Sequence, residues 1–252
     1  MELLDFGLIF GAALLAGALN AIAGGGSFIS FPALLVAGVP PIIANATNAL
    51  ALWPGTLASV KAYRQEIQGQ RRDLILFSGL SLIGGLLGAL LLLYTDEQRF
   101  TALIPYLLLF ATLVFTFSPQ VTRLTHRVVG TSGNKQRILV AVVYVAIAIY
   151  GGFFGAGLGI LTLAALALLG YTNIHQMNAL KTLQASLING IAVITFVVTG
   201  LIAWTPALVM TVGAMIGGYG GAAIARRINA SRVRTVVVWL SIGLTIWFFV
   251  RS

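Results

Sequence analysis

Long apolar segments follow one another through almost the whole chain of 252 residues, and this succession limits the possible folds more than any other feature. Hydrophobic residues make up 59% of the chain and charged residues 8%, whereas a soluble domain carries about 25% charged residues. Most segments approach the length of about 20 residues that an α-helix needs to cross a bilayer. They lack the strict apolar–polar alternation of barrel strands. The sequence therefore predicts an all-α polytopic membrane protein.

The predicted helices form two sets of five. The first set covers residues 3–23, 27–38, 44–63, 74–94 and 100–117. The second set covers 138–154, 160–169, a segment that carries Lys181 and ends before Gly200, 206–225 and 235–250. In each set the second helix is short and follows a cluster of glycines. Twelve helical residues reach only about 18 Å, so we expect these two pieces to be half-helices or strongly tilted helices.

The two halves of the chain align with each other at a nearly constant offset. Residues 44–50 lie over residues 177–183 at a shift of 133. A shift of 132 places Gly25 over Gly157, and one residue inserted in the second turn accounts for the difference. Matches that persist at one shift indicate an internal repeat. We predict a first membrane repeat over residues 1–117, a cytoplasmic connecting loop over 118–137, and a second membrane repeat over 138–252.

Charges in equivalent loops predict that the two repeats are inverted. The loop after the third segment is basic, with Lys61, Arg64, Arg71 and Arg72, whereas its counterpart at 200–205 is uncharged. The next loop reverses this relation: Asp96, Glu97 and Arg99 correspond to Arg226, Arg227, Arg232 and Arg234. Lys and Arg favour the cytoplasmic side, so equivalent loops should lie on opposite faces. Inverted repeats with glycine-interrupted helices are typical of secondary transporters that bind substrate near the membrane centre.

Lys181 is the one charged residue inside an otherwise uncharged hydrophobic segment. The segment contains no carboxylate that could pair with it. A charge within a membrane span is costly and therefore indicates a function. The alternative is that Lys181 lies near the start of its helix and extends its ammonium group to the interface.

Polar side chains surround Lys181 and its repeat equivalent, Asn48. Asn45 and Asn178 occupy a second pair of equivalent positions, each three residues earlier, and Gln184 extends the face of Lys181 by three more. Residues three apart share a helix face. Alternatively, these amides join helices to each other, or Asn45 and Asn178 are helix N-caps.

The glycine clusters predict broken helices at Gly25, Gly26 and Ser27 in the first half and at Gly157 in the second. A helix break frees backbone N–H groups and points a positive dipole end at its surroundings, which suits an anion. The two breaks are expected to meet near the pseudo-twofold axis. Alternatively, the glycines allow close helix packing, which is our interpretation of Gly84, Gly85, Gly88, Gly217, Gly218 and Gly221. A cation, amides and helix ends together predict a site for a small oxyanion.

Other kinds of chemistry lack the residues that they need. The chain has no cysteine, and its two histidines, His126 and His175, are far apart in sequence and without neighbouring carboxylates. Neither a nucleophile–base pair nor a phosphate-binding loop motif is present. We predict no catalytic residue, no metal site, no cofactor and no nucleic-acid partner. The net charge of +9 is explained first by the orientation rule for membrane proteins.

Two glycine-rich motifs are distinctive: Ala-Gly-Gly-Gly-Ser-Phe-Ile-Ser-Phe-Pro-Ala-Leu at residues 23–34, followed by Gly38 and Ala-Asn-Ala-Thr-Asn, and Gly-Gly-Phe-Phe-Gly-Ala-Gly-Leu-Gly at 151–159. With these motifs the chain resembles the TauE/SafE sulfite exporter family. The resemblance extends over nearly the whole chain. It implies a bacterial or archaeal inner-membrane permease for sulfite, sulfonates or related organosulfur anions.

The resulting functional hypothesis is a multi-pass secondary transporter that exports a small sulfur-containing oxyanion by alternating access around a central site. Its expected partners are that anion, the lipid bilayer and, as a possibility left open, further copies of the chain. Two alternatives remain open: an anion channel of similar architecture, or an uptake permease for a related organic anion. A membrane scaffold without transport would leave Lys181 unexplained.

Cysteine labelling tests the predicted orientation without background, because the chain has no native cysteine. A membrane-impermeant maleimide should label Gln68→Cys and Ser132→Cys only from the cytoplasmic face, and Asp96→Cys only from the outside. Labelling is measured in intact cells and in inside-out vesicles. Labelling of Gln68→Cys and Asp96→Cys from the same face would contradict the inverted repeat.

Overall fold

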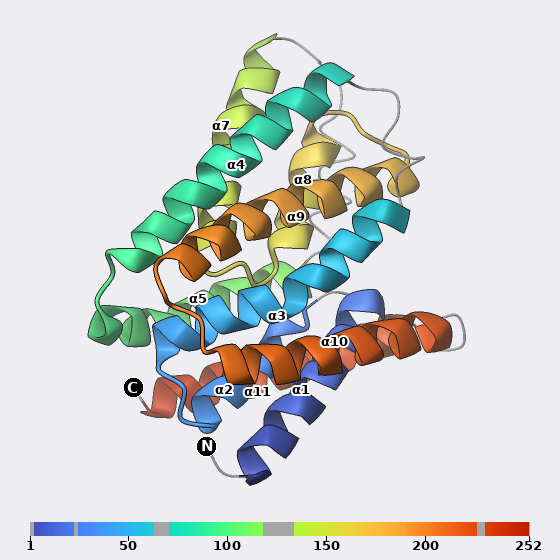
Figure 1. Ribbon diagram of the computed structural model, residues 1–252. Helices are drawn as coiled ribbons and strands as arrows, with labels where there is room; N and C mark the ends of the chain where they lie inside the picture. The colour runs from blue at the N-terminus through green and yellow to red at the C-terminus, as the bar shows by residue number, and fades with distance from the viewer. Residues whose placement is uncertain (1–2, 23–24, 63–70, 118–133, 226–229, 252) are drawn as a thin grey trace. The chain divides into compact units, whose positions relative to one another are not determined.

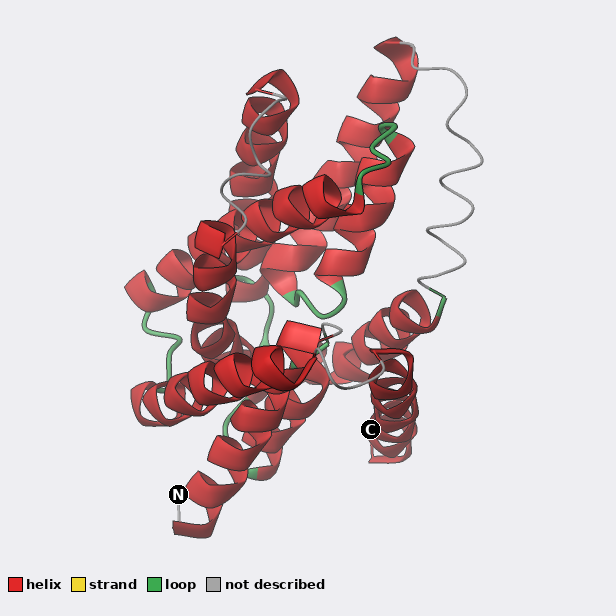
Figure 2. Cartoon of the chain, turned by 90° about the vertical axis from the view of Figure 1, so that its right-hand side faces the viewer, coloured by secondary structure: helices red, strands yellow, loops and turns green. Residues whose placement is uncertain are grey.

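The computed structural model describes residues 3–22, 25–62, 71–117, 134–225 and 230–251. Within these ranges every regular element is an α-helix (Figures 1 and 2). The helices are α1 (Leu3–Ile22), α2 (Ser27–Val36), α3 (Pro41–Ala62), α4 (Arg71–Leu93), α5 (Glu97–Thr116), α7 (Asn134–Phe153), α8 (Leu158–Leu168), α9 (Ile174–Val198), α10 (Trp204–Ala225) and α11 (Ala230–Arg251). The prediction of an all-α polytopic membrane protein is confirmed.

Each predicted segment corresponds to one helix of the structure. In the described residues three helices are long and apolar enough to cross a membrane, at Leu74–Leu93, Glu97–Thr116 and His175–Val198. The main difference from the prediction is at helix starts, because α3 begins at Pro41 and not at residue 44. Several predicted features lie outside the described residues: Gly24, most of the connecting loop at 118–137, and the basic residues Arg64, Arg226 and Arg227.

The short helices α2 and α8 have matching ends, which gives the sequence repeat a counterpart in local geometry. Gly25 (φ 87°) and Gly157 (φ 77°) lie just before them in the left-handed region, which glycine adopts without strain. At their other ends, the N–H groups of Val39 and Tyr171 donate to the carbonyl oxygens of Leu34 and Leu166, at 3.0 and 3.2 Å. These bonds close equivalent Schellman turns, in which Gly38 and Gly170 adopt the left-handed conformation. The ten and eleven residues of α2 and α8 extend about 15–17 Å, as half-helices do.

The chain divides into two compact units, and each contains segments of both sequence halves. The first unit comprises residues 1–55, 92–113 and 196–252. The second unit comprises residues 56–91 and 114–195. Sequence repeats and compact units are therefore different divisions of this chain. The repeat boundaries at 117 and 138 stay a prediction.

In the first unit α1 crosses α10 at a contact made by small residues (Figure 1). A Cβ atom added at Gly213 would lie 2.8 Å from the carbonyl oxygen of Phe10, and one at Gly217 would collide with the backbone of Leu14. A Cβ at Gly17 would collide with the backbone of Ala214 on the other helix. Small residues let two membrane helices approach backbone to backbone. The packing interpretation of Gly217 is confirmed, whereas Gly218 has only ordinary contact distances.

In the second unit α4 packs in the same manner against α7 and α9 (Figure 1). A Cβ at Gly84 would overlap Ala148 of α7, and one at Gly85 would lie 2.9 Å from the carbonyl oxygen of Ile188 of α9. At Gly88 it would lie 2.8 Å from the backbone nitrogen of Phe153. The packing interpretation of these three α4 glycines is therefore confirmed.

A buried hydrogen-bond chain fixes the register of α4 against α7. Ser81 donates to the carbonyl oxygen of Phe77 at 2.7 Å, so the hydroxyl of Tyr144 is the donor in its 2.5 Å bond to Ser81. The rings of Phe77 and Tyr144 also meet edge to face, with centroids 4.9 Å apart. Because each hydroxyl has a partner, both are accommodated in an apolar interior.

Two alanine substitutions on α4 test the packing. Gly88→Ala should destabilise the protein by about 1–3 kcal/mol, because the added methyl group overpacks the contact with α7. Gly79→Ala is the matched control, since a Cβ at Gly79 meets nothing within 4 Å and alanine favours a helix over glycine. Melting temperatures of the purified variants in detergent give the comparison. Equal or higher stability of Gly88→Ala would contradict the close contact.

Candidate anion site

Lys181 lies inside α9 and not at its end. The helix begins at Ile174, which places Lys181 about 10 Å along the axis. Its Nζ atom donates to Oδ1 of Asn178 at 3.2 Å. No carboxylate of the described residues forms an ion pair with Lys181. The structure therefore holds this ammonium group with a neutral amide as its hydrogen-bond partner.

The aliphatic part of the Lys181 side chain lies against the first turn of α8. A Cβ atom added at Gly159 would be 3.3 Å from Cδ and 3.8 Å from Cγ of Lys181. Gly159 thus leaves room for the lysine where any larger residue would press on it. The N-terminus of a helix carries a partial positive charge, so this contact places a cation beside a second positive group. Two positive groups side by side favour the binding of an anion between them.

The turn before α8 leaves a backbone donor free. The N–H of Leu158 donates to the carbonyl oxygen of Gly155, and those of Ile160 and Leu161 donate to Gly157. Among the described residues no acceptor is found for the N–H of Gly159. Tyr150 holds this turn in place, because its hydroxyl donates to the carbonyl oxygen of Ala156 at 2.6 Å. Tyr150 therefore stabilises the break between α7 and α8 through a carbonyl oxygen, and the N–H of Gly159 remains available to a ligand.

The equivalent break in the first unit has a self-contained hydrogen-bond network. Ser30 donates to Oδ1 of Asn48 at 2.5 Å, and Nδ2 of Asn48 donates to Ser27 at 3.3 Å. The N–H of Gly26 donates to Oδ1 of Asn20 at 2.8 Å. Asn48 and Ser30 are buried. The side chains of this cluster bond to one another and to the turn, and the cluster carries no charge.

The two breaks repeat one local design with different chemistry. The shift of 132 places Ser27 over Gly159 and Ser30 over Thr162. The hydroxyl oxygen of Ser30 lies 3.2 Å from the carbonyl oxygen of Gly26, and that of Thr162 donates to the carbonyl oxygen of Leu158 at 3.0 Å, in each case four residues earlier. Where Asn48 reaches Ser27, its equivalent Lys181 reaches Gly159. Replacing a serine by glycine makes space for the longer, charged side chain, so the second unit contains the cationic version of the contact.

The structure brings together the predicted site residues in two groups. Asn48, Ser27 and Gly26 meet in the first unit, beside Gly25. Lys181 and Asn178 lie in the second unit, on the helix that packs against the turn after Gly157. That both groups serve one site stays a prediction.

The N-cap alternative for Asn45 and Asn178 is wrong, because both helices begin earlier. Asn173 caps α9, since its Oδ1 accepts the N–H groups of His175 and Gln176 at 2.9 and 3.3 Å. At the start of α3 the N–H of Ile42 donates to Oε1 of Glu97 at 3.1 Å. Asn45 is instead buried inside α3, with 4% of its surface exposed.

Several residues of the two breaks were missing from the predicted site: Gly159, Ser30, Thr162, Tyr150 and Asn20. Ser30 and Thr162 carried a signal, because the shift of 132 aligns two hydroxyl residues in otherwise apolar helices. Tyr150 and Asn20 carried none, since each acts through a contact across a turn.

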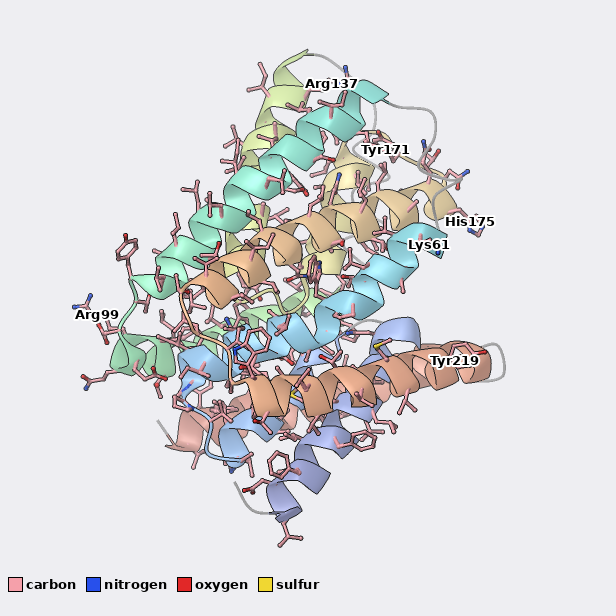
Figure 3. All side chains as sticks on the ribbon, viewed as in Figure 1. Lys61, Arg99, Arg137, Tyr171, His175 and Tyr219 are labelled. Carbon is pink, nitrogen blue, oxygen red and sulfur yellow. The ribbon has the colours of Figure 1, made fainter. Side chains whose placement is uncertain are left out.

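Other basic groups of the second unit lie at helix ends. Figure 3 shows Arg137 at the top of the view and Lys61 and His175 at its right-hand side, near the start of α7, the end of α3 and the start of α9. Lys181 is thereby distinguished from them by its place within a helix.

The first unit contains a hollow of about 480 Å³. It is lined by Phe6, Ala37, Gly38, Val39, Pro40, Ile43, Ile202, Ala203, Thr205 and Pro206. This lining contains no charged group and none of the predicted site residues.

Apolar helices with glycine contacts and a partly buried cation within a helix are features of a multi-pass membrane transporter. The sequence model described as "Sulfite exporter TauE/SafE" matches residues 9–248, and the chain belongs to this family. A "Probable membrane transporter protein" of Haemophilus influenzae is 30% identical over 243 residues, which cover 94% of this chain and 92% of the relative. The "Probable membrane transporter protein YfcA" of Escherichia coli is 27% identical over 241 residues, covering 93% and 86%. No solved structure matches this chain.

Replacing Lys181 by glutamine tests the site directly. Lys181→Gln should weaken anion binding about 10- to 100-fold, because a hydrogen bond to a charged group contributes about 1.5–3 kcal/mol. Expression and folding should be nearly unchanged. Lys61→Gln, at the exposed end of α3, is the matched control and should bind normally. Binding is measured by the shift in melting temperature that sulfite or a sulfonate produces. Unchanged affinity in Lys181→Gln would restore the interpretation as an interfacial lysine.

Proposed function

We propose that this protein is a secondary transporter that exports a small sulfur-containing oxyanion, such as sulfite or an organosulfonate, by alternating access. The description of its family names sulfite export. The observation that carries the proposal for this chain is the contact of Lys181 with Gly159 at the first turn of α8. It joins a cation, a helix N-terminus and an open N–H group in one place.

This combination fits an anion that must be released again. Lysine provides a compact charge with rotatable donors, whereas arginine would hold an oxyanion through two fixed hydrogen bonds. Backbone N–H groups at a helix end add directional contacts to the oxygen atoms. A sulfur oxyanion has three or more oxygen atoms, enough to accept from both groups at once.

The proposed energy source is the substrate gradient together with the membrane potential. The carboxylates of the chain lie in loops or at the ends of the predicted segments, as Asp5 does in the first segment and Asp73 beside the fourth, and intramembrane carboxylates are the usual carriers of coupling protons or sodium ions. An inside-negative potential favours the exit of an anion by about 2.3 kcal/mol per charge per 100 mV. We therefore propose uniport or anion exchange.

Proteoliposomes loaded with sulfite, sulfate, thiosulfate, sulfoacetate or a carboxylate test the proposal. A sulfur oxyanion should leave by saturable efflux that exchanges with external substrate, and an imposed inside-negative potential should accelerate the efflux without a sodium or pH gradient. Vesicles with Lys181→Gln are the control and should show little transport.

Three outcomes would contradict parts of this proposal. Unitary currents without exchange would indicate a channel. Transport of carboxylates alone would refute the substrate class. A strict requirement for a sodium or proton gradient at fixed potential would refute the coupling mechanism.

A further inference from the structure

Gln184 contains a buried hydrogen-bond acceptor with no partner. Its side chain is 2% exposed, and no donor reaches its Oε1 atom among the described residues. Native proteins rarely leave such an atom unsatisfied, because burial removes its bonds to water without replacement. A ligand that donates a hydrogen bond to this oxygen during transport would satisfy the acceptor and explain its burial.

The position of Gln184 on α9 directs it to the turn before α8. Lys181, Gln184 and Ile188 follow one another at intervals of three and four residues, so they form one stripe along the helix. The lysine at one end of the stripe contacts Gly159. Ile188 at the other end packs in one apolar cluster with Leu158. Gln184 lies between these two contacts and therefore faces the same turn of α8.

Donors and an acceptor thus meet at the first turn of α8. Lys181 has three N–H donors, of which Asn178 accepts one. The N–H of Gly159 adds another donor. These groups suit the acid oxygens of an anion. The carbonyl of Gln184 repels such oxygens and instead accepts an O–H or N–H group.

We propose that Gln184 recognises a hydrogen-bond donor on the transported anion, so that the preferred substrates carry a hydroxyl or amino group beside the acid group. This inference rests on the proposed function of the Lys181 site. Gln184 lies about 4.5 Å further along the helix axis than Lys181. A link of two carbon atoms between a sulfonate and a hydroxyl group bridges such a separation.

Two sulfonates of nearly equal size test this inference. 2-Hydroxyethanesulfonate has the donor, and 1-propanesulfonate has a methyl group in its place. The purified protein should bind the hydroxylated compound about tenfold more tightly, as measured by ligand-dependent melting temperatures. Gln184→Met keeps the length of the side chain and removes the acceptor, so the preference should disappear through weaker binding of the hydroxylated compound. Gln176→Met on the same helix is the matched control and should keep the preference.

The outcomes separate this inference from the proposal on which it rests. Equal affinities of the native protein for the two sulfonates would overturn the role of Gln184, while Lys181-dependent binding of both would leave the anion site intact. A preference that survives in Gln184→Met would also overturn it. If sulfite binds in a manner that depends on Lys181 and neither sulfonate binds, the role of Gln184 is also overturned. Failure of sulfite and both sulfonates to bind would instead refute the anion site itself. The comparison in the native protein decides the question even where a variant does not fold.

Discussion

A helix that breaks inside a membrane must satisfy or use the backbone groups that the break exposes, and this constraint shapes both units. At the first break Asn20 accepts the N–H of Gly26, and Asn48 joins two serines. At the second break Tyr150 supplies a donor to the carbonyl of Ala156. The first solution leaves a neutral cluster of side chains. The second places a lysine beside the open N–H group, and this charge makes the second break the better candidate for an anion.

Small residues make this arrangement possible, because they let helices approach until backbone meets backbone. Gly84, Gly85 and Gly88 bring α4 against α7 and α9. One of these helices, α9, presents Ile188 and Lys181 to the first turn of α8. Gly159 serves the site in a different way, since its missing side chain makes room for the lysine stem. Glycine therefore acts here as a packing residue and as part of the site.

The alignment of the two sequence halves relates the two clusters to each other. Equivalent positions carry asparagine in one half and lysine in the other, and serine in one half and glycine in the other. In the second half the side chain on the long helix is larger and charged, and the residue that it contacts is smaller. The contact therefore persists while its chemistry changes. A neutral cluster that satisfies itself supports the fold. A cation with an open donor and an unsatisfied acceptor beside it is suited to bind and release an anion.

The sequence by itself determined the class of the protein, the number and approximate bounds of its described helices, and the two glycine breaks, and it singled out Lys181 as the charge within a helix. These features are local, because hydropathy, glycine content and an isolated charge act within one segment. Only the tertiary structure decided that α1 packs with α10, that Asn48 bonds to Ser27 and Ser30, and that Lys181 lies on Gly159. It also placed the start of α9 at a cap on Asn173, which excluded Asn178 as the cap. Such contacts depend on the matching surfaces of two segments far apart in the chain, and the periodicity of one segment contains no information about its partner.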